Sequence, residues 1–155
     1  MKIILFRFEK EKIHFLECDI DSGNIILGDK EKISLESTTS RGAKYNKVIE
    51  ELLRIQTKYS PHIFAYQSPQ KYRGAIKDEE GFANSSMLHL YCYQNNVRME
   101  ELTPVLVRGK LSIPNKNFKE LLENNKNQIL EDYTIAKSDK LMDGLVLLFS
   151  LKETY

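Results

Sequence analysis

Residues 59–67 read Tyr-Ser-Pro-His-Ile-Phe-Ala-Tyr-Gln, and this stretch decides the fold class. Ser60 precedes a proline, which disfavours the α conformation, so a helix that comes before it should end here. The short apolar run at residues 62–67 is typical of a buried strand. A helix followed by such a strand is a crossover unit, which predicts an α/β domain whose new strand runs parallel to the first.

Upstream of this stretch, apolar residues recur at helical spacing from Tyr45 onward, and Ser40 is a plausible N-cap, which predicts a helix from there to Tyr59. Before that helix, β-rich runs at residues 2–8, 13–19 and 25–35 are separated by short polar turns. Strands joined by tight turns pair as antiparallel neighbours, so the first 36 residues predict a three-stranded meander.

Downstream, the pattern predicts further helices and one more strand. We expect a loop over residues 68–79, a helix over 82–94 ended by Asn95-Asn96, and a strand at 104–107. A polar helix follows at 115–131, and a last apolar helix should begin near Ser138.

The chain has 155 residues and a formal net charge of +1. This length is typical of one domain, so we expect residues 1–155 to form a single unit. The small charge excludes a global positive field, and any nucleic-acid binding must depend on a local patch. The longest later apolar run, Leu145–Leu151, is far shorter than the ~20 residues that span a bilayer, and Cys18 and Cys92 form no C-x-x-C pair. We therefore expect a cytoplasmic protein with reduced cysteines.

Two segments resemble a known family. The sequences VIEELL at 48–53 and YSPHIFAYQ at 59–67 resemble the RuvC helix that ends in tyrosine and proline before a strand with an acidic residue, and SDKLMDGLVLL at 138–148 is similar to the RuvC closing helix. The chain thus resembles the RuvC branch of the ribonuclease-H-like nucleases, the Holliday junction resolvases. The resemblance implies a five-stranded mixed sheet of order 3-2-1-4-5, an antiparallel meander followed by parallel strands, flanked by helices.

The resemblance also implies a metal site. RuvC-like nucleases hold divalent cations between an aspartate on the first strand, a glutamate on the fourth and aspartates on the last helix, because hard ions such as Mg²⁺ need clustered carboxylates. In this sequence the first-strand position falls near Arg7 or Phe8, and the fourth-strand position falls on Gln67. Neither Arg7 nor Phe8 can bind Mg²⁺, and the amide of Gln67 is a weak ligand.

In the last helix Asp143 matches one aspartate, but the position three residues earlier is Lys140. Asp139 lies one helical turn from Asp143, so a shifted register could restore one pair. The competing interpretation is that both aspartates are only favourable charges in a first helical turn. With Arg7 and Lys140 nearby, the site is too electropositive for two divalent cations. We expect Asp143, Asp139 and Gln67 to be relics of a catalytic site, with no cofactor bound.

Basic residues at the vacated positions could bind phosphate directly. The candidates for nucleic-acid binding are Arg7, Lys71, Tyr72, Arg73, Lys110 and Lys140. The 71–73 stretch combines two cations with an aromatic ring that can stack on a base. Each set also has a plain structural interpretation: the loop and the Lys110 region could be solvated surface, and Arg7 could lie at an edge or solvent-facing position, paired with Glu17 or Glu9.

Three functions follow as hypotheses. The leading one is a catalytically degenerate domain that binds branched or structured DNA. The second is an active Mg²⁺-dependent junction endonuclease that uses Asp139, Asp143 and Glu9 or Glu17. The third is a non-enzymatic protein-interaction module, in which the helix at 82–94, with Tyr91 and Tyr93, forms a homodimer.

Overall fold

A computed structural model of the chain describes residues 1–68, 71–72, 75–76 and 78–155. In chain order the elements are β1 (Lys2–Phe8), β2 (Lys12–Asp21), β3 (Asn24–Ser34), α1 (Arg41–Tyr59), β4 (Ile63–Gln67), β5 (Lys71–Tyr72), β6 (Ala75–Ile76), α2 (Glu79–Asn95), β7 (Arg98–Leu102), α3 (Pro104–Leu111), α4 (Asn115–Asp132), α5 (Met142–Ser150) and the short 3-10 helix η1 (Lys152–Thr154).

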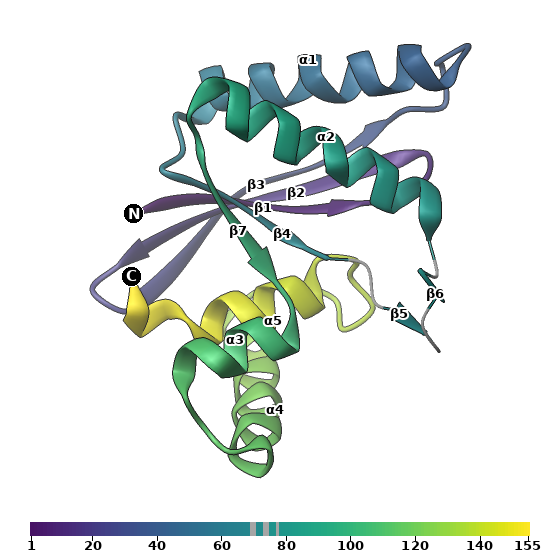
Figure 1. Ribbon diagram of the computed structural model, residues 1–155. Helices are drawn as coiled ribbons and strands as arrows, with labels where there is room; N and C mark the ends of the chain where they lie inside the picture. The colour runs from purple at the N-terminus through teal and green to yellow at the C-terminus, as the bar shows by residue number, and fades with distance from the viewer. Residues whose placement is uncertain (69–70, 73–74, 77) are drawn as a thin grey trace.

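The main sheet has five strands in the order β3-β2-β1-β4-β7 (Figure 1). β1, β2 and β3 pair antiparallel, and β4 and β7 continue the sheet in parallel. Ser22 and Gly23 form the tight turn between β2 and β3, with φ angles of 51° and 77°, the left-handed values that suit a two-residue hairpin. The predicted meander and mixed sheet are confirmed.

The predicted crossover helix is also confirmed, with both of its ends. The hydroxyl of Ser40 accepts a hydrogen bond of 3.1 Å from the backbone N–H of Ala43, which caps the start of α1. At the other end Ser60, just before the proline, adopts a left-handed conformation and ends the helix. The chain then enters β4 beside β1, with Ile3 paired to Ile63.

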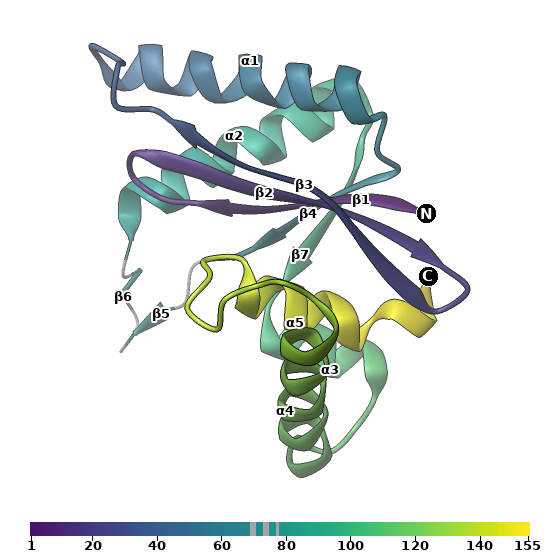
Figure 2. The ribbon, with the colours of Figure 1, turned by 180° about the vertical axis from the view of Figure 1, so that it is seen from behind.

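Helices cover both faces of the sheet. α1 and α2 lie on one face, and α3, α4 and α5 lie on the other (Figures 1 and 2). Side chains alternate along β1, so that Ile4 and Phe6 pack towards α1 and α2, whereas Ile3 and Leu5 pack towards α5. Because β1 is central and covered on both sides, it is almost continuously apolar.

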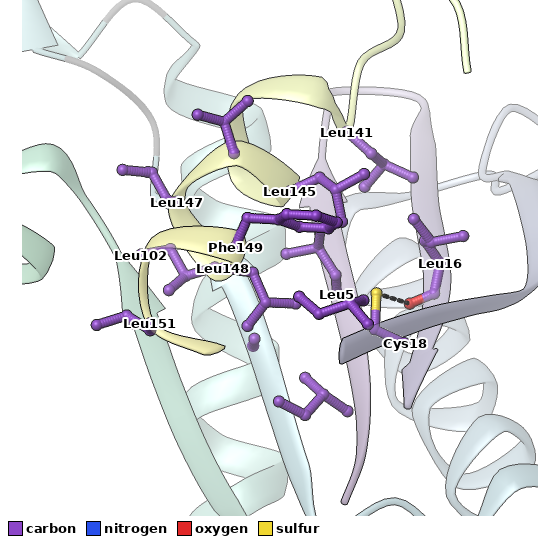
Figure 3. Packing of buried hydrophobic residues seen from close by; sticks show 14 of the residues in the cluster. Leu5, Leu16, Cys18, Leu102, Leu141, Leu145, Leu147, Leu148, Phe149 and Leu151 are labelled. Carbon is purple, nitrogen blue, oxygen red and sulfur yellow. Dashed lines mark hydrogen bonds between the residues drawn. The ribbon is translucent and has the colours of Figure 1, made fainter. Parts of the chain in front are cut away.

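The core under α5 explains why that helix is so apolar. Leu145, Leu148 and Phe149 are buried against β1, β2 and β7, near Leu5 and Leu16 (Figure 3). The described part of the chain contains no helix that is both long and apolar enough to cross a membrane.

One expected strand is wrong. The strand after α2 is β7, whereas the expected strand at residues 104–107 lies in α3. Thr103 caps α3 through a hydrogen bond of 3.2 Å from the N–H of Leu106, and Pro104 occupies the first turn, where its missing N–H costs nothing. A short apolar run does not by itself distinguish a strand from a helix.

The start of the last helix is also corrected. α5 begins at Met142 instead of near Ser138. Asp139 therefore lies in the preceding loop, and Asp143 lies in the first turn of the helix.

Candidate functional site

The ends of β1 and β4 bring together two residues singled out from the sequence. Nη1 of Arg7 donates a hydrogen bond of 2.8 Å to Oε1 of Gln67. Gln67 is only 6% exposed, and Arg7 is half-buried. Arg7 is on a central strand, Glu17 pairs with Lys2, and Glu9 pairs with His14 and Lys140. The expected edge position of Arg7 and its expected pairing with Glu17 or Glu9 are therefore wrong.

Glu9 lies beyond the end of β1, and two basic side chains contact its carboxylate. His14 Nε2 lies 3.0 Å from Oε2 of Glu9, and Nζ of Lys140 lies 3.2 Å from Oε1. Burial raises the pKa of Glu9, but the hydrogen bonds from His14 and Lys140 outweigh burial, and the net pKa is lowered. Glu9 therefore joins β1, β2 and the loop before α5.

Asp139 makes a similar connection on the far side of the loop. Its carboxylate pairs with Nζ of Lys30 on β3 and also accepts a hydrogen bond of 2.9 Å from the N–H of Leu141. Burial raises the pKa of Asp139, but the bonds with Lys30 and Leu141 lower it by more, so the net pKa is lowered. Asp139 is held by Lys30 at the edge strand β3 and lies outside α5, so it does not share a helix face with Asp143. The expectation that a shifted register pairs Asp139 with Asp143 is wrong.

Asp143 is exposed and faces a different neighbourhood. With Gln67, it lines a groove between α3, α4 and α5. The approach of α5 to the strand ends depends on Gly144, because an added Cβ there would lie 3.2 Å from Cδ1 of Leu5 and 3.3 Å from Cβ of Gln67. Asp143 is thus brought beside Gln67 by a close helix–sheet contact.

The arrangement has solved structural counterparts. RuvC of Thermus thermophilus in complex with a Holliday junction substrate superposes with a TM-score of 0.65 and 15% identity, covering 97% of this chain and 92% of that chain. The protein has a RuvC-like fold. The yeast mitochondrial Holliday junction resolvase Ydc2 gives a TM-score of 0.60 at 12% identity, over 97% of this chain and 78% of that one.

A viral resolvase shows the same RuvC-like fold. The fowlpox virus resolvase bound to Holliday junction DNA gives a TM-score of 0.54 at 17% identity and covers 100% of this chain and 96% of that chain. The sequence itself matches no family description and no curated protein. The likeness to these structures therefore concerns the ribonuclease-H-like fold.

The side chains at the strand ends do not fit a divalent cation. Within residues 1–68 and 78–155, no three acidic, histidine or cysteine side chains gather to hold a metal ion. Arg7 occupies the end of β1, Gln67 that of β4, and Lys140 the loop before Asp143. A Mg²⁺ ion prefers several oxygen ligands of negative charge, whereas this RuvC-like domain offers two cations, one amide and the carboxylates of Asp143 and Glu9, of which Glu9 is already paired with His14 and Lys140.

Basic side chains lie at one end of the three-stranded meander, across β1, β2 and β3. Arg7 pairs across the sheet with His14, and His14 pairs with Lys32 on β3. Directly opposed residues point to the same face, so these side chains form a row across β1, β2 and β3 on the face of α5. Lys30, two residues from Lys32, extends the row. We call Arg7, Lys30, Lys32 and Lys140 the cationic row, in which His14 lies between Arg7 and Lys32.

The remaining basic candidates have mixed outcomes. Lys71 and Tyr72 form β5, which pairs with β6 in a two-stranded hairpin, and Arg73 lies outside the described residues. Lys110 forms an ion pair with the buried carboxylate of Glu100. A DNA-binding role for these residues stays a prediction.

Sequence reasoning missed the contributions of β3 and α4 to the site. Lys30 was not singled out, although it holds Asp139. The residues of α4 that line the groove beside Asp143 include Lys126 and Asn127. Lys126 is four residues from both Leu122 and Leu130, so the sequence places the three residues on one face of α4. Only the position of α5 in the structure shows that this face borders the groove.

Proposed function

We propose that this RuvC-like domain binds branched DNA through the cationic row and has lost metal-dependent cleavage. The observation that carries the proposal is the hydrogen bond from Arg7 to Gln67. It places a cation and a neutral amide at the two strand ends, where the resemblance implies metal-binding carboxylates. A site of this composition attracts phosphate and repels divalent cations.

Arg7 retains donors for a phosphate. A guanidinium has five N–H groups in a planar fork, and only one hydrogen bond, to Gln67, is formed by Arg7 within the described residues. Gln67 fixes one arm of the fork, which reduces the entropy lost when the other arm meets an anion. Arg7 is therefore prepared for a bidentate or bridging contact with the DNA backbone.

Lys32 and Lys140 extend this contact on either side. Lys32 is exposed, and Lys140 reaches over the row from the loop before α5. Cations in the row outnumber the carboxylates Glu9 and Asp139 that pair with it. A local excess of positive charge is what a protein of formal charge +1 needs to bind a polyanion.

Branched DNA is favoured over other polyanions by the comparisons. The structures of T. thermophilus RuvC and the fowlpox virus resolvase contain Holliday junction DNA, and their folds cover nearly the whole of this chain. The strand ends that carry Arg7 and Gln67 are part of that shared fold.

A salt-dependent anisotropy titration tests the proposal. Four-way-junction, duplex and single-stranded DNA are titrated between about 50 and about 200 mM salt, with Mg²⁺ in a parallel series assayed for cleavage. We expect tightest binding to the junction and no cleavage. Arg7→Gln and Lys140→Gln should each lower the slope of log K against log salt by about one.

The matched control is Arg54→Gln. Arg54 lies on α1, on the opposite face of the sheet, and pairs with Glu51 and Glu31. It should leave the junction preference unchanged. Absence of binding at low salt contradicts DNA recognition, and Mg²⁺-dependent cleavage that stops in Asp143→Ala contradicts the loss of activity.

A second candidate, self-association through α2, is favoured by exposed apolar side chains. Phe82, Leu90 and Tyr93 are 41%, 44% and 88% exposed, and their spacing places them along one side of the helix. The expectation that Tyr91 is also exposed there is wrong, because Tyr91 is buried and donates a hydrogen bond to Gln56. Large apolar and aromatic side chains are enriched at protein interfaces. A homodimer through α2 is compatible with DNA binding, because the cationic row lies on the other face of the sheet.

A further inference from the structure

A groove of about 880 Å³ adjoins the cationic row and is not used by the proposed phosphate contact. It opens at the carboxyl ends of β4 and β7 and is lined by residues of α3, α4 and α5. In α/β sheets, ligands bind outside the carboxyl ends of parallel strands. Gln67 and Asp143 lie both at the candidate site and in the groove wall, so the two regions are continuous.

The groove combines an apolar slot with a charged rim. Pro104 and Val105 on α3, Leu122 on α4 and Val146 and Leu147 on α5 all line it. These side chains give the slot an apolar lining, against which a flat apolar ring can be held by dispersion contacts.

The rim carries both signs of charge. The lysines that line it are Lys119, Lys126 and Lys137, and the carboxylates are Glu123 and Asp143. Across the ranges 1–68 and 78–155, none of these side chains forms an ion pair, whereas Lys30 and Lys140 of the cationic row do. Side chains of this kind are available to a ligand that carries an anion and hydrogen-bond donors together.

We propose that the groove receives one unpaired nucleotide of the bound DNA. This inference rests on the proposed DNA binding and names the feature of the DNA that is recognised. A nucleotide supplies a phosphate for Lys126, a planar base for the slot at Leu122, and base N–H groups for carboxylates such as Glu123. A paired and stacked base cannot enter such a slot, whereas an unpaired one at a branch can do so at small cost.

The direction of the DNA is consistent with this placement. A strand whose phosphate contacts Arg7 passes Gln67, and Gln67 borders the groove. The adjoining nucleotide can then turn between α4 and α5 without leaving the positive side of the site, where Lys137 lies at the rim. The groove thus gives the cationic row a preference for DNA that has an unpaired base at the branch.

The first test compares two junctions that differ in one base. One has an unpaired 2-aminopurine at the branch, and the other has an abasic unit there. We expect about tenfold tighter binding to the first and a change in 2-aminopurine emission on binding. Lys126→Ala and Leu122→Trp, which fills part of the slot, should bring the affinity ratio close to one.

Lys116→Ala is the matched control, because Lys116 is an exposed lysine of the same helix that does not line the groove. It should leave the ratio unchanged. Equal affinity of the wild-type protein for both junctions overturns the groove proposal and leaves the proposed DNA binding intact.

A second test decides the groove even if no junction binds. The methyl signals of Leu122, Val146 and Leu147 are followed by NMR during titration with adenosine monophosphate at millimolar concentration. Shifts in these signals that are weakened in Lys126→Ala support a nucleotide site. Unchanged signals in the absence of junction binding overturn both proposals. Shifts without junction binding overturn the DNA-binding function and show that the groove binds a free nucleotide instead of one in bound DNA.

Discussion

Arg7 and Gln67 hold each other across the central pair of parallel strands, Nη1 of the arginine donating to Oε1 of the amide at 2.8 Å. This pair is chemically self-consistent, because the neutral amide accepts from the guanidinium and brings no further charge. The pair lies at the ends of β1 and β4, the positions where the resemblance to RuvC implies metal-binding carboxylates.

Carboxylates placed at both strand ends should create a site for a divalent cation. In the double variant Arg7→Asp with Gln67→Glu, a cation is lost and two carboxylates are added beside Asp143. We expect Mn²⁺ to bind at least about tenfold more tightly than to the wild-type protein, a gain of about 1.4 kcal/mol. Calorimetric titration measures this, and adding Asp143→Asn should reverse the gain. Equal Mn²⁺ affinities would show that Asp143 does not face the strand ends.

The contacts of Glu9 predict a specific acid sensitivity. Burial raises the pKa of Glu9, but the bonds from His14 and Lys140 lower it overall, below the ordinary value of 4.5. A carboxyl group whose pKa is lowered on folding stabilises the fold at pH values above its unfolded-state pKa. This stabilisation is lost as the pH falls through the lower, folded-state pKa. Glu9→Gln should therefore flatten the fall in stability below about pH 4.5, as measured by urea unfolding at several pH values.

The control for this measurement is Glu131→Gln, an exposed glutamate on α4. It should keep the wild-type pH dependence. Identical slopes for the wild-type protein and Glu9→Gln would mean that the contacts with His14 and Lys140 contribute nothing to stability.

Much of the fold could be predicted because its signals are local. The break at Ser60 and Pro61 and the apolar run that follows are readable in the sequence, and they place Gln67 at the end of a strand parallel to β1. That placement predicts that residues at the ends of these strands are neighbours, as Arg7 and Gln67 are.

The ion pair of Asp139 could not be predicted from local sequence patterns. Its partner, Lys30, is 109 positions away, and the pairing depends on how the loop before α5 crosses β3. Helical spacing placed Asp139 on a face with Asp143 only under the assumption that the helix already included it. Charge pairing between distant elements carries no periodic signal, so the groove and the loop contacts required the structure.

The close contact at Gly144 should make this position sensitive to size. In Gly144→Val the new side chain meets Leu5 and Gln67, where even a Cβ would lie at 3.2 and 3.3 Å. We expect a loss of about 1–3 kcal/mol in the free energy of unfolding. Gly109→Ala on α3 is the matched control, because nothing lies within 4 Å of an added Cβ, and it should stabilise by up to about 1 kcal/mol. Denaturant unfolding compares the two, and equal effects would contradict the close helix–sheet contact.

Self-association through α2 predicts a change of mass in solution. Leu90→Asp places a charge in the exposed apolar side of α2, 44% exposed in the single chain. If that side is buried between two copies, the uncompensated carboxylate should shift a dimer to monomer, as measured by light scattering coupled to size-exclusion chromatography. Leu53→Asp, at a 55% exposed leucine on α1, introduces the same charge outside α2 and should leave the mass unchanged. A wild-type monomer at all concentrations contradicts the dimer, and dissociation by both variants places the interface beyond α2.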